Sequence, residues 1–346
     1  MSQIRPGNKL LRILIIGLIS LVYTTSISSC TNEDAYLDEQ YLFIAPDPII
    51  NPESEYIIVI GDIQESTQTW ENLEYLIYSL DWIRNQQNHY GNIKCLLQDG
   101  DITNNNLNWQ WDMALNAFHH LKDSTMYVWC TGNHDYTWGG ENNFTISDRN
   151  SSLLDDYLVD NHLLNSNIIA WYKNGSYHNI VVKNMVKGER LDIISLEFGS
   201  PPEVISWAAE YVRSNPTRRF ILMTHEYMTR AGERVSDDQS YAKSQFVEYP
   251  HTGPEYVWEN LVYPNDNILC VVNGHNGFCK YLETKNAKGR MVPQILFNLQ
   301  YQENGGDSMI QLWEFPKHEN RVVIKVYNTL KQIFPEPEST SFTFTY

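Results

Sequence analysis

Five segments of this sequence share one arrangement, in which a run of β-forming residues ends and a side chain able to bind a metal ion follows within a few positions. In an α/β sheet, the loops after the carboxyl ends of the strands lie along one edge, where ligands bind. The arrangement therefore predicts that five separated segments converge on one site. The runs and the residues after them are 56–60 before Asp62 and Gln64, 93–97 before Asp101, 126–129 before Asn133, His134 and Asp135, 219–223 before His225, and 268–272 before His275.

Helical spacing separates several of these runs. It predicts helices near 70–88, 108–121 and 202–213, and strands that alternate with helices of this length are typical of βα units. With 346 residues and 42% hydrophobic content, the chain can bury a substantial core, as one large domain or two. Beyond His275 the pattern predicts successive strands at 294–299, 310–315, 322–326 and 341–346.

The order Gly-Asp, Gly-Asp, Gly-Asn-His-Asp, Thr-His and Gly-His resembles that of the calcineurin-like metallophosphoesterases, from about Glu55 onward. A single Gly-Asp pair is common, but five motifs in this order, including the tetrapeptide 132–135, are specific. The resemblance implies an α/β (α+β) domain over 55–346, a four-layer sandwich of two packed mixed β-sheets flanked by helices. Residues 286–346 would supply strands that complete the second sheet. Asp62-Ile63-Gln64 and Gly274-His275-Asn276-Gly277 are similar to a secreted bacterial subgroup.

The resemblance also implies two divalent metal ions and a metal-activated hydroxide that hydrolyses a phosphate ester. Two ions about 3.5 to 4 Å apart stabilise both the entering and the departing oxygen. Asp101 matches the carboxylate that bridges the ions in the family. The second ion would be held by Asp101, Asn133, His225 and His275.

The first metal site departs from the family pattern, because Gln64 and Gly277 stand where the family has imidazoles. Asp62, the amide oxygen of Gln64 and Asp101 remain, and all three are oxygen donors. The loss of nitrogen ligands shifts the preference from zinc towards harder ions such as manganese, magnesium or calcium. The choice among Mn, Mg, Fe, Zn and Ca stays open, and the first site could be weak enough to fill only when substrate arrives.

His134 follows a metal ligand without matching one, so we expect it to be catalytic, giving a proton to the leaving oxygen or bonding the phosphoryl group. Asp135 could fix the tautomer of that imidazole, or it could be a turn or helix-cap residue. Asn104 and Arg230 are weaker substrate-binding candidates. Asparagine is common in turns, and Arg230, although arginine can hold phosphate with two hydrogen bonds, also fits a surface role.

The N-terminus has the features of a secretion signal. Basic residues precede the apolar run 13–22, which is too short to favour a transmembrane helix, and Ile-Ser-Ser-Cys at 27–30 resembles a bacterial lipobox. We expect residues 1–29 to be a lipoprotein signal peptide, Cys30 to be lipidated and 30–54 to be a flexible tether. The protein would then be anchored in the bacterial cell envelope, on the periplasmic face or the cell surface. An ordinary signal peptide with an incidental cysteine is the alternative.

A formal net charge of −17 argues against nucleic acid as a partner, so we expect a small phosphorylated substrate. The oligomeric state and a disulfide between Cys270 and Cys279 are left open. Two functions fit the sequence. One is a metal-dependent phosphoesterase that hydrolyses a phosphate mono- or diester outside the cytoplasm, favoured by His134 and the complete second site. The other is a catalytically impaired lipoprotein of the same fold that binds a phosphorylated or glycan ligand, favoured by Gln64 and Gly277.

Overall fold

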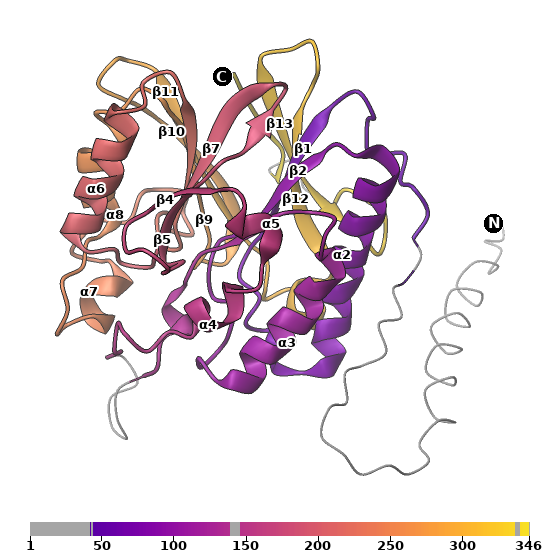
Figure 1. The fold of residues 1–346 in the computed structure, drawn as a ribbon, viewed down its shortest axis with the longest axis horizontal. Coiled ribbons are helices and arrows are strands. Elements are labelled where there is room, and N and C mark those ends of the chain that lie inside the picture. The colour runs from indigo at the N-terminus through magenta and orange to yellow at the C-terminus, as the bar shows by residue number, and fades with distance from the viewer. Residues whose placement is uncertain (1–41, 43, 139–145, 336–339, 346) are drawn as a thin grey trace, which may run out of the picture. The chain divides into compact units, whose positions relative to one another are not determined.

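The computed structural model describes residues 42, 44–138, 146–335 and 340–345. Every element described below belongs to one compact unit, Tyr41–Tyr346 (Figure 1). The expected signal peptide, Cys30 and the first part of the expected tether lie outside the described residues. No helix in the described part of the chain is long and apolar enough to cross a membrane.

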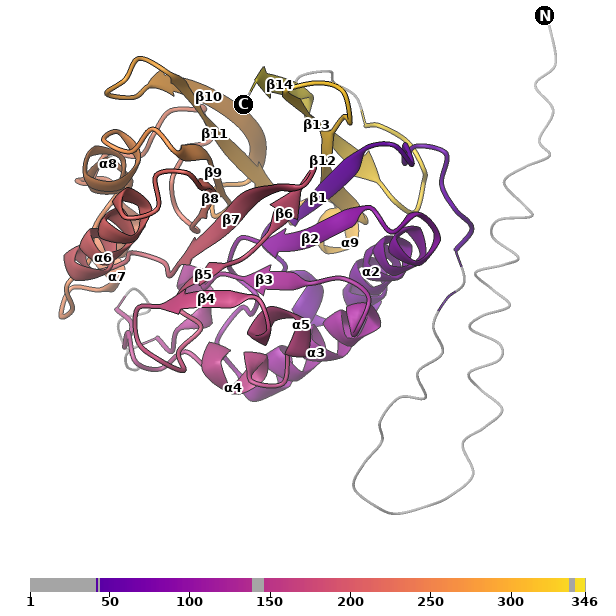
Figure 2. The same cartoon turned by 45° about the horizontal axis from the view of Figure 1, so that its top comes forward.

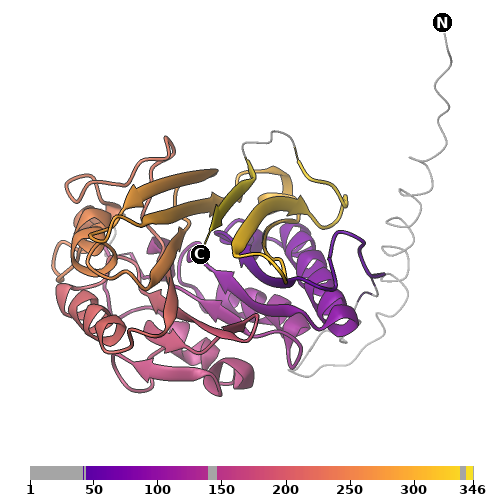
Figure 3. The same cartoon turned by 90° about the horizontal axis from the view of Figure 1, so that it is seen from above.

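Two mixed β-sheets form the centre of this unit, as Figures 2 and 3 show from two directions. The six-stranded sheet has the order β14-β13-β12-β1-β2-β3, and β1, β2 and β3 run parallel. Its strands are β1 (Glu55–Ile60), β2 (Ile93–Gln98), β3 (Tyr127–Trp129), β12 (Met309–Phe315), β13 (Arg321–Asn328) and β14 (Phe342–Thr345).

The eight-stranded sheet has the order β10-β11-β9-β8-β7-β5-β4, with the short β6 paired to β7. Its central strands β7, β8, β9 and β11 are parallel neighbours. The strands are β4 (Ile168–Trp171), β5 (Asn179–Val182), β6 (Met185–Val186), β7 (Glu189–Leu196), β8 (Arg219–Met223), β9 (Ile268–Asn273), β10 (Phe278–Lys285) and β11 (Met291–Asn298).

Helices cover the outer faces of the two sheets. Figure 2 shows α2 and α3 beside the strands β1 to β3, and α6 and α8 beside the strands β7 to β9. The helices are α2 (Trp70–Tyr90), α3 (Asn108–Phe118), α4 (Leu154–Leu158), α5 (His162–Asn165), α6 (Pro202–Arg213), α7 (Tyr241–Gln245), α8 (Pro254–Val257) and α9 (Glu303–Gly306), with a π-helical turn at Trp258–Val262. The predicted sandwich of two mixed sheets flanked by helices is confirmed.

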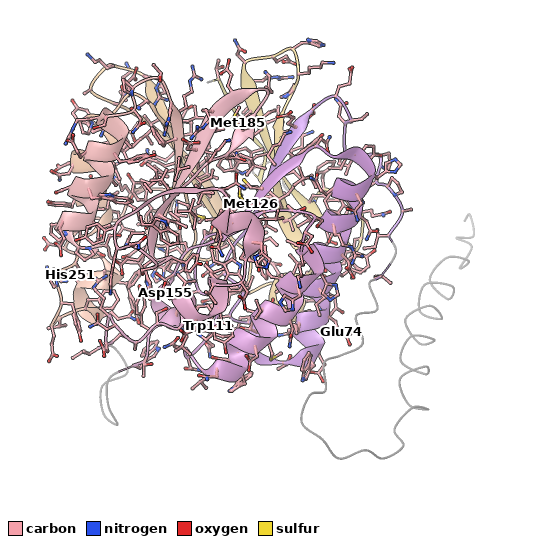
Figure 4. All side chains as sticks on the ribbon, viewed as in Figure 1. Glu74, Trp111, Met126, Asp155, Met185 and His251 are labelled. Atoms are coloured by element: carbon pink, nitrogen blue, oxygen red, sulfur yellow. The ribbon has the colours of Figure 1, made fainter. Side chains whose placement is uncertain are left out.

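Strand β8 illustrates how the layers are held together. Ile221 and Met223 belong to the core cluster that also contains residues of β1 and β2, whereas Phe220 and Leu222 belong to the cluster that packs under α6. Successive side chains of a strand point to opposite faces, so both faces of β8 are buried. On the other outer layer, Trp111 of α3, labelled in Figure 4, is fully buried and packs against Trp129 of β3.

The strands after residue 286 do not all complete one second sheet, which corrects that expectation. β11 joins the eight-stranded sheet, but β12, β13 and β14 extend the six-stranded sheet from the edge of β1. β12 pairs antiparallel with β1 over five residues. The tail therefore ties the two sheets together instead of adding to one.

Residues 44–54 are not a free tether, and this part of the expectation is wrong. Ile44 and Ile50 are buried in the core, and Asp47 is 3% exposed. The Asp47 carboxylate accepts hydrogen bonds from Trp82 of α2 and from Tyr327 of β13. The folded domain consequently begins before Glu55, because this segment packs against α2. Cys270 and Cys279, the pair left open, are both free thiols.

Candidate metal centre

Four predicted ligands come together at the carboxyl ends of β2, β3, β8 and β9. The Oδ1 atom of Asn133 lies 2.8 Å from Nδ1 of His275 and 3.2 Å from Nε2 of His225. Nε2 of His225 also lies 3.2 Å from Oδ1 of Asp101. Ligand atoms of Asp101, His225 and His275 all lie within 4.8 Å of one another, and they are the only such group of His, Cys, Asp and Glu within the described ranges.

Glycines before the ligands allow this close approach. A Cβ at Gly100 would come within 3.0 Å of the His225 ring, and a Cβ at Gly132 would come within 3.0 Å of the Asp101 carboxylate. Gly100 also has φ +112°, which side chains rarely tolerate. Asp101 and His275 themselves have positive φ angles of 51° and 65°. Strained backbone of this kind persists where the surroundings enforce it, and it is concentrated at functional sites.

The site concentrates charge away from water. Burial alone would lower the pKa of His225, but the carboxylates of Asp101 and Asp62 raise it to about 10. Burial, together with the charge of His225, lowers the pKa of His275 to about 3. Burial raises the pKa of Asp62 to about 8, against the opposing effect of the His225 charge. Such opposed shifts within one cluster are typical of a site that exchanges protons or holds a cation.

Asp62, predicted for the first metal, is fixed by amides from the end of β11. Asn298 Nδ2 and Gln300 Nε2 donate to its Oδ2 atom, the latter at 3.0 Å, while the backbone N–H of His275 donates to Oδ1 at 3.0 Å. Asn298 lies in the predicted strand 294–299 and Gln300 directly follows it, and neither residue was predicted to belong to the site. The polar side chains at the end of this strand, as at the five other strand ends, were the sequence feature that could have identified them.

Gln64, the other predicted ligand of the first metal, presents its amide nitrogen to Asp101. Nε2 donates to Asp101 Oδ2 at 2.9 Å, and Oε1 is buried without a hydrogen-bond partner among the described residues. A half-turn of the amide would present the oxygen at the same place. The pairing places the Gln64 amide beside the carboxylate of Asp101, which is the predicted bridge between the two ions.

Gly277, which replaces an imidazole of the family pattern, lies against an aromatic ring. A Cβ at this position would lie 2.8 Å from Cδ2 of Tyr301. Tyr301 is 64% exposed, and its electrostatic neighbours include Asp62, Asp101 and Arg230. The phenol ring therefore occupies space beside the first metal site that a larger residue 277 would need.

His134 lies at the edge of the same cluster. Its backbone N–H donates to Asp101 Oδ1 at 2.9 Å, and its ring Nδ1 lies 2.8 Å from the carbonyl oxygen of Asn104. A carbonyl oxygen only accepts, so Nδ1 carries the proton and Nε2 is the atom that can act on a ligand. The backbone bond to Asp101 thus holds the ring beside the predicted ligands.

Asp135 does not orient the His134 ring, and the structure favours the alternative interpretation as a turn residue. Its fully buried carboxylate accepts from the backbone N–H groups of Gly132, Ile102 and Thr103, at 2.8, 3.1 and 2.8 Å, and from the Thr103 hydroxyl. Burial and the Asp101 charge raise its pKa to about 6. The carboxylate binds the loop after β2 to the loop after β3, while the Asn104 carbonyl fixes the imidazole tautomer.

The two substrate-binding candidates lie near the centre. Asn104 contributes its carbonyl to His134. Arg230 is exposed, and its charge acts on His275 and Tyr301. Two further residues support the ligands without having been predicted: Gln245 donates to the carbonyl of Asn133 at 2.6 Å, and Glu226 lies 4.0 Å from His275.

The donors present fit divalent metal ions. The Asp101 group combines a carboxylate with two imidazoles and an amide oxygen, a mixed set that suits zinc, iron or manganese. The Asp62 side offers oxygens, including the unpartnered Oε1 of Gln64. Unpartnered buried acceptors are costly in an apolar interior, and a cation relieves that cost.

An α/β sandwich with such a cluster at its strand ends has the architecture of a metal-dependent hydrolase. The calcineurin-like phosphoesterase family model matches residues 56–291, and the chain belongs to this family. It is 24% identical over 261 residues to the uncharacterized protein YvnB of Bacillus subtilis (strain 168), a match that covers 72% of this chain and 18% of YvnB.

Solved structures of other proteins are also similar to this chain. Purple acid phosphatase PPD1 from yellow lupin (Lupinus luteus) seeds has the same fold and matches 84% of this chain and 54% of its own length, with a TM-score of 0.51 and 11% identity. The 5′-nucleotidase precursor from Thermus thermophilus matches 84% of this chain and 54% of its own length, with a TM-score of 0.41 and 14% identity. The chain thus spans about half of these two structures and a smaller part of YvnB.

Proposed function

We propose that the protein is a metal-dependent phosphoesterase that hydrolyses a phosphate mono- or diester of a small substrate. The convergence of Asp101, His225 and His275 within 4.8 Å, with Asn133 between the imidazoles, is the observation that carries the proposal. Family membership supports the reaction class. The substrate itself is a matter of pocket shape and not of fold.

The residues named above would hold two divalent ions, one at Asn133, His225 and His275, one at Asp62 and Gln64, with Asp101 between them. When bound, such ions activate water and stabilise the charge that develops on phosphoryl oxygens. The protein contributes the fixed positions of the ligands. Asn298 and Gln300 orient Asp62, and Asp135 keeps the loops of Asp101 and Asn133 in register.

His134 would donate the proton that the leaving oxygen needs. With Nδ1 bonded to the Asn104 carbonyl, the protonated ring keeps its second N–H for the substrate. Arg230 would bind a phosphate oxygen from the exposed side of the centre. The net charge of −17 supports a small phosphorylated molecule over nucleic acid, because an acidic surface repels long polyanions.

The decisive measurement is hydrolysis of a panel of monoesters and diesters with Mn²⁺, Mg²⁺ or Zn²⁺. The His134→Ala variant should lose about 10² to 10⁴ in turnover while it keeps its metal, which is the usual share of general acid catalysis. The loss should be smaller for nitrophenyl esters, whose leaving group departs without a proton. His89→Ala, an exposed histidine at the end of α2, is the matched control and should stay fully active.

A protein that binds metal but hydrolyses no ester would favour the second function, a lipoprotein that binds a phosphorylated or glycan ligand. The specific observation behind that alternative is the Gln64 amide, which bonds the bridging carboxylate in place of an imidazole ligand. An active His134→Ala variant would keep the enzyme and remove this residue from its mechanism.

We also propose that Cys30 is lipidated and anchors the protein in the bacterial envelope, on its periplasmic face or the cell surface. The lipobox-like segment 27–30 after an apolar run supports this. Cys30→Ala should move the protein from the membrane fraction to the soluble fraction of the producing cell, and Cys279→Ala should not. Unchanged membrane association of Cys30→Ala would contradict the anchor.

A further inference from the structure

Asp99 is a buried acid for which the two-metal pattern provides no role. It lies between the end of β2 and Asp101, and its side chain is 0% exposed. Both carboxylate oxygens are without a hydrogen-bond partner, and no other buried carboxylate in the described part of the chain has both oxygens unbonded. An ionised carboxylate in such a place is strongly unfavourable unless a cation compensates it.

Other buried acids of this protein are compensated. Asp135 accepts four hydrogen bonds, and Asp192 accepts two from the guanidinium of Arg190 at 2.8 and 2.7 Å. Asp99 is therefore an exception that calls for a partner outside the protein.

The position of Asp99 points to the first metal site. A Cβ built on Gly274 would come within 3.0 Å of Oδ1 of both Asp62 and Asp99. The two oxygens are thus close neighbours across a glycine, and the missing side chain leaves a gap between them. The backbone of Asp99 is fixed from two directions, because its N–H bonds Ile60 of β1 and its carbonyl lies 2.9 Å from Nδ1 of His225.

We propose that Asp99 is an additional ligand of the first metal ion and supplies the donor that the absent imidazoles would have given. The first site would then consist of Asp62, Gln64, Asp99 and Asp101, a set of oxygen donors that favours manganese, magnesium or calcium over zinc. The assignment rests on the metal-dependent function proposed above. It adds a residue that the family pattern does not include.

Metal titration of Asp99→Asn in the full-length protein tests this without reference to activity. After removal of metal with a chelator, the wild type should take up two Mn²⁺ ions per chain. Asp99→Asn should keep the ion of the His225 site and bind the other at least about 10- to 100-fold more weakly, the loss that even a residue supporting a ligand typically causes. The retained ion also reports that the variant is folded.

Thermal unfolding adds a signature that a structural role would not give. Without metal, Asp99→Asn should be as stable as the wild type or more so, because an uncompensated buried acid is removed. In excess Mn²⁺ it should be less stable than the wild type. Asp192→Asn, a buried acid paired with arginine, is the matched control and should be destabilised equally under both conditions.

Binding of two Mn²⁺ ions with wild-type affinity by Asp99→Asn would overturn the proposal and leave the phosphoesterase function intact. If the wild type bound no metal at all, both proposals would fail. Should Asp99→Asn not fold, a wild-type crystal soaked in Mn²⁺ still decides: an anomalous peak about 2.0 to 2.6 Å from an Asp99 oxygen is expected, and a first ion lying well beyond that distance contradicts the assignment.

Discussion

The two sides of the candidate metal centre are built differently. On the His225 side, the ligands contact one another, since Asn133 Oδ1 lies within hydrogen-bond distance of both imidazoles and His225 reaches Asp101. On the Asp62 side, the carboxylates are held by amides: Asn298 and Gln300 donate to Asp62, and Gln64 donates to Asp101. The His225 side is therefore preassembled. On the Asp62 side, amide donors stabilise the carboxylates in the way that a cation would.

This difference indicates unequal affinities. Imidazole and carboxylate together bind first-row metal ions tightly, whereas a site of carboxylates and amides binds harder ions and more weakly. A preassembled site also loses less conformational freedom on binding. We therefore expect one ion to be retained through purification and the other to exchange with the solution, in agreement with the weaker first site that Gln64 and Gly277 indicate.

The largest expected effect comes from removing an imidazole on the preassembled side. His225→Ala should lose the tightly held ion and lower turnover by about 10³ or more, since a catalytic metal supplies several kcal/mol of transition-state stabilisation. Gln64→Ala should lose only the exchangeable ion. Metal analysis and steady-state kinetics of both variants test these two predictions. Equal losses of metal and turnover in the two variants would show that the two metal sites do not differ in affinity.

The sequence predicted much of this arrangement because strand ends in an α/β sheet must meet at one edge. The predicted helix 202–213 coincides with α6 (Pro202–Arg213), and 70–88 falls within α2 (Trp70–Tyr90). Asp101, Asn133, His225 and His275 were candidates because they follow β runs, and their assignment as one ligand set came from the resemblance to the calcineurin-like metallophosphoesterases.

What the sequence could not predict were contacts between distant segments. Asp47 accepts a hydrogen bond from Tyr327, 280 residues away. No local feature of the sequence distinguishes Asp47 from a residue of a flexible tether. Asp135 is adjacent to His134 in sequence, yet its partners are Ile102 and Thr103 of another loop. The sequence gives no sign of a role for Asp99, because a buried carboxylate without a hydrogen-bond partner cannot be recognised until its neighbours are known.

Asp135 gives a second, intermediate effect, because it braces the loops of the preassembled side. Asp135→Asn replaces an acceptor with an N–H₂ group that faces backbone donors, so we expect a loss of about 2 to 4 kcal/mol in the free energy of unfolding. The measurement is urea unfolding with and without Mn²⁺. Asp238→Asn, whose side chain is 93% exposed, should change stability by less than about 0.5 kcal/mol. A neutral Asp135→Asn would mean that the two loops need no brace.

The smallest expected effect concerns whether the weaker side can be converted into the stronger one. Gly277→His restores an imidazole in the last motif, but its Cβ would lie 2.8 Å from the Tyr301 ring. Tyr301 is 64% exposed and can swing outward, so the single variant should cost about 1 kcal/mol, the low end of the range for overpacking, and gain little metal affinity. Gly277→His combined with Tyr301→Ala frees the space, and its first site should bind Zn²⁺ about tenfold more tightly than the wild type, because a nitrogen ligand suits that ion.

Zinc titration of the wild type, both single variants and the double variant shows how much each substitution contributes to the zinc affinity. Tight zinc binding by Gly277→His alone would show that the ring is no obstacle. If the double variant gained nothing, residue 277 would lie beyond reach of the first ion, and the contrast between the two sides would stem from Asp62, Gln64 and Asp99 instead.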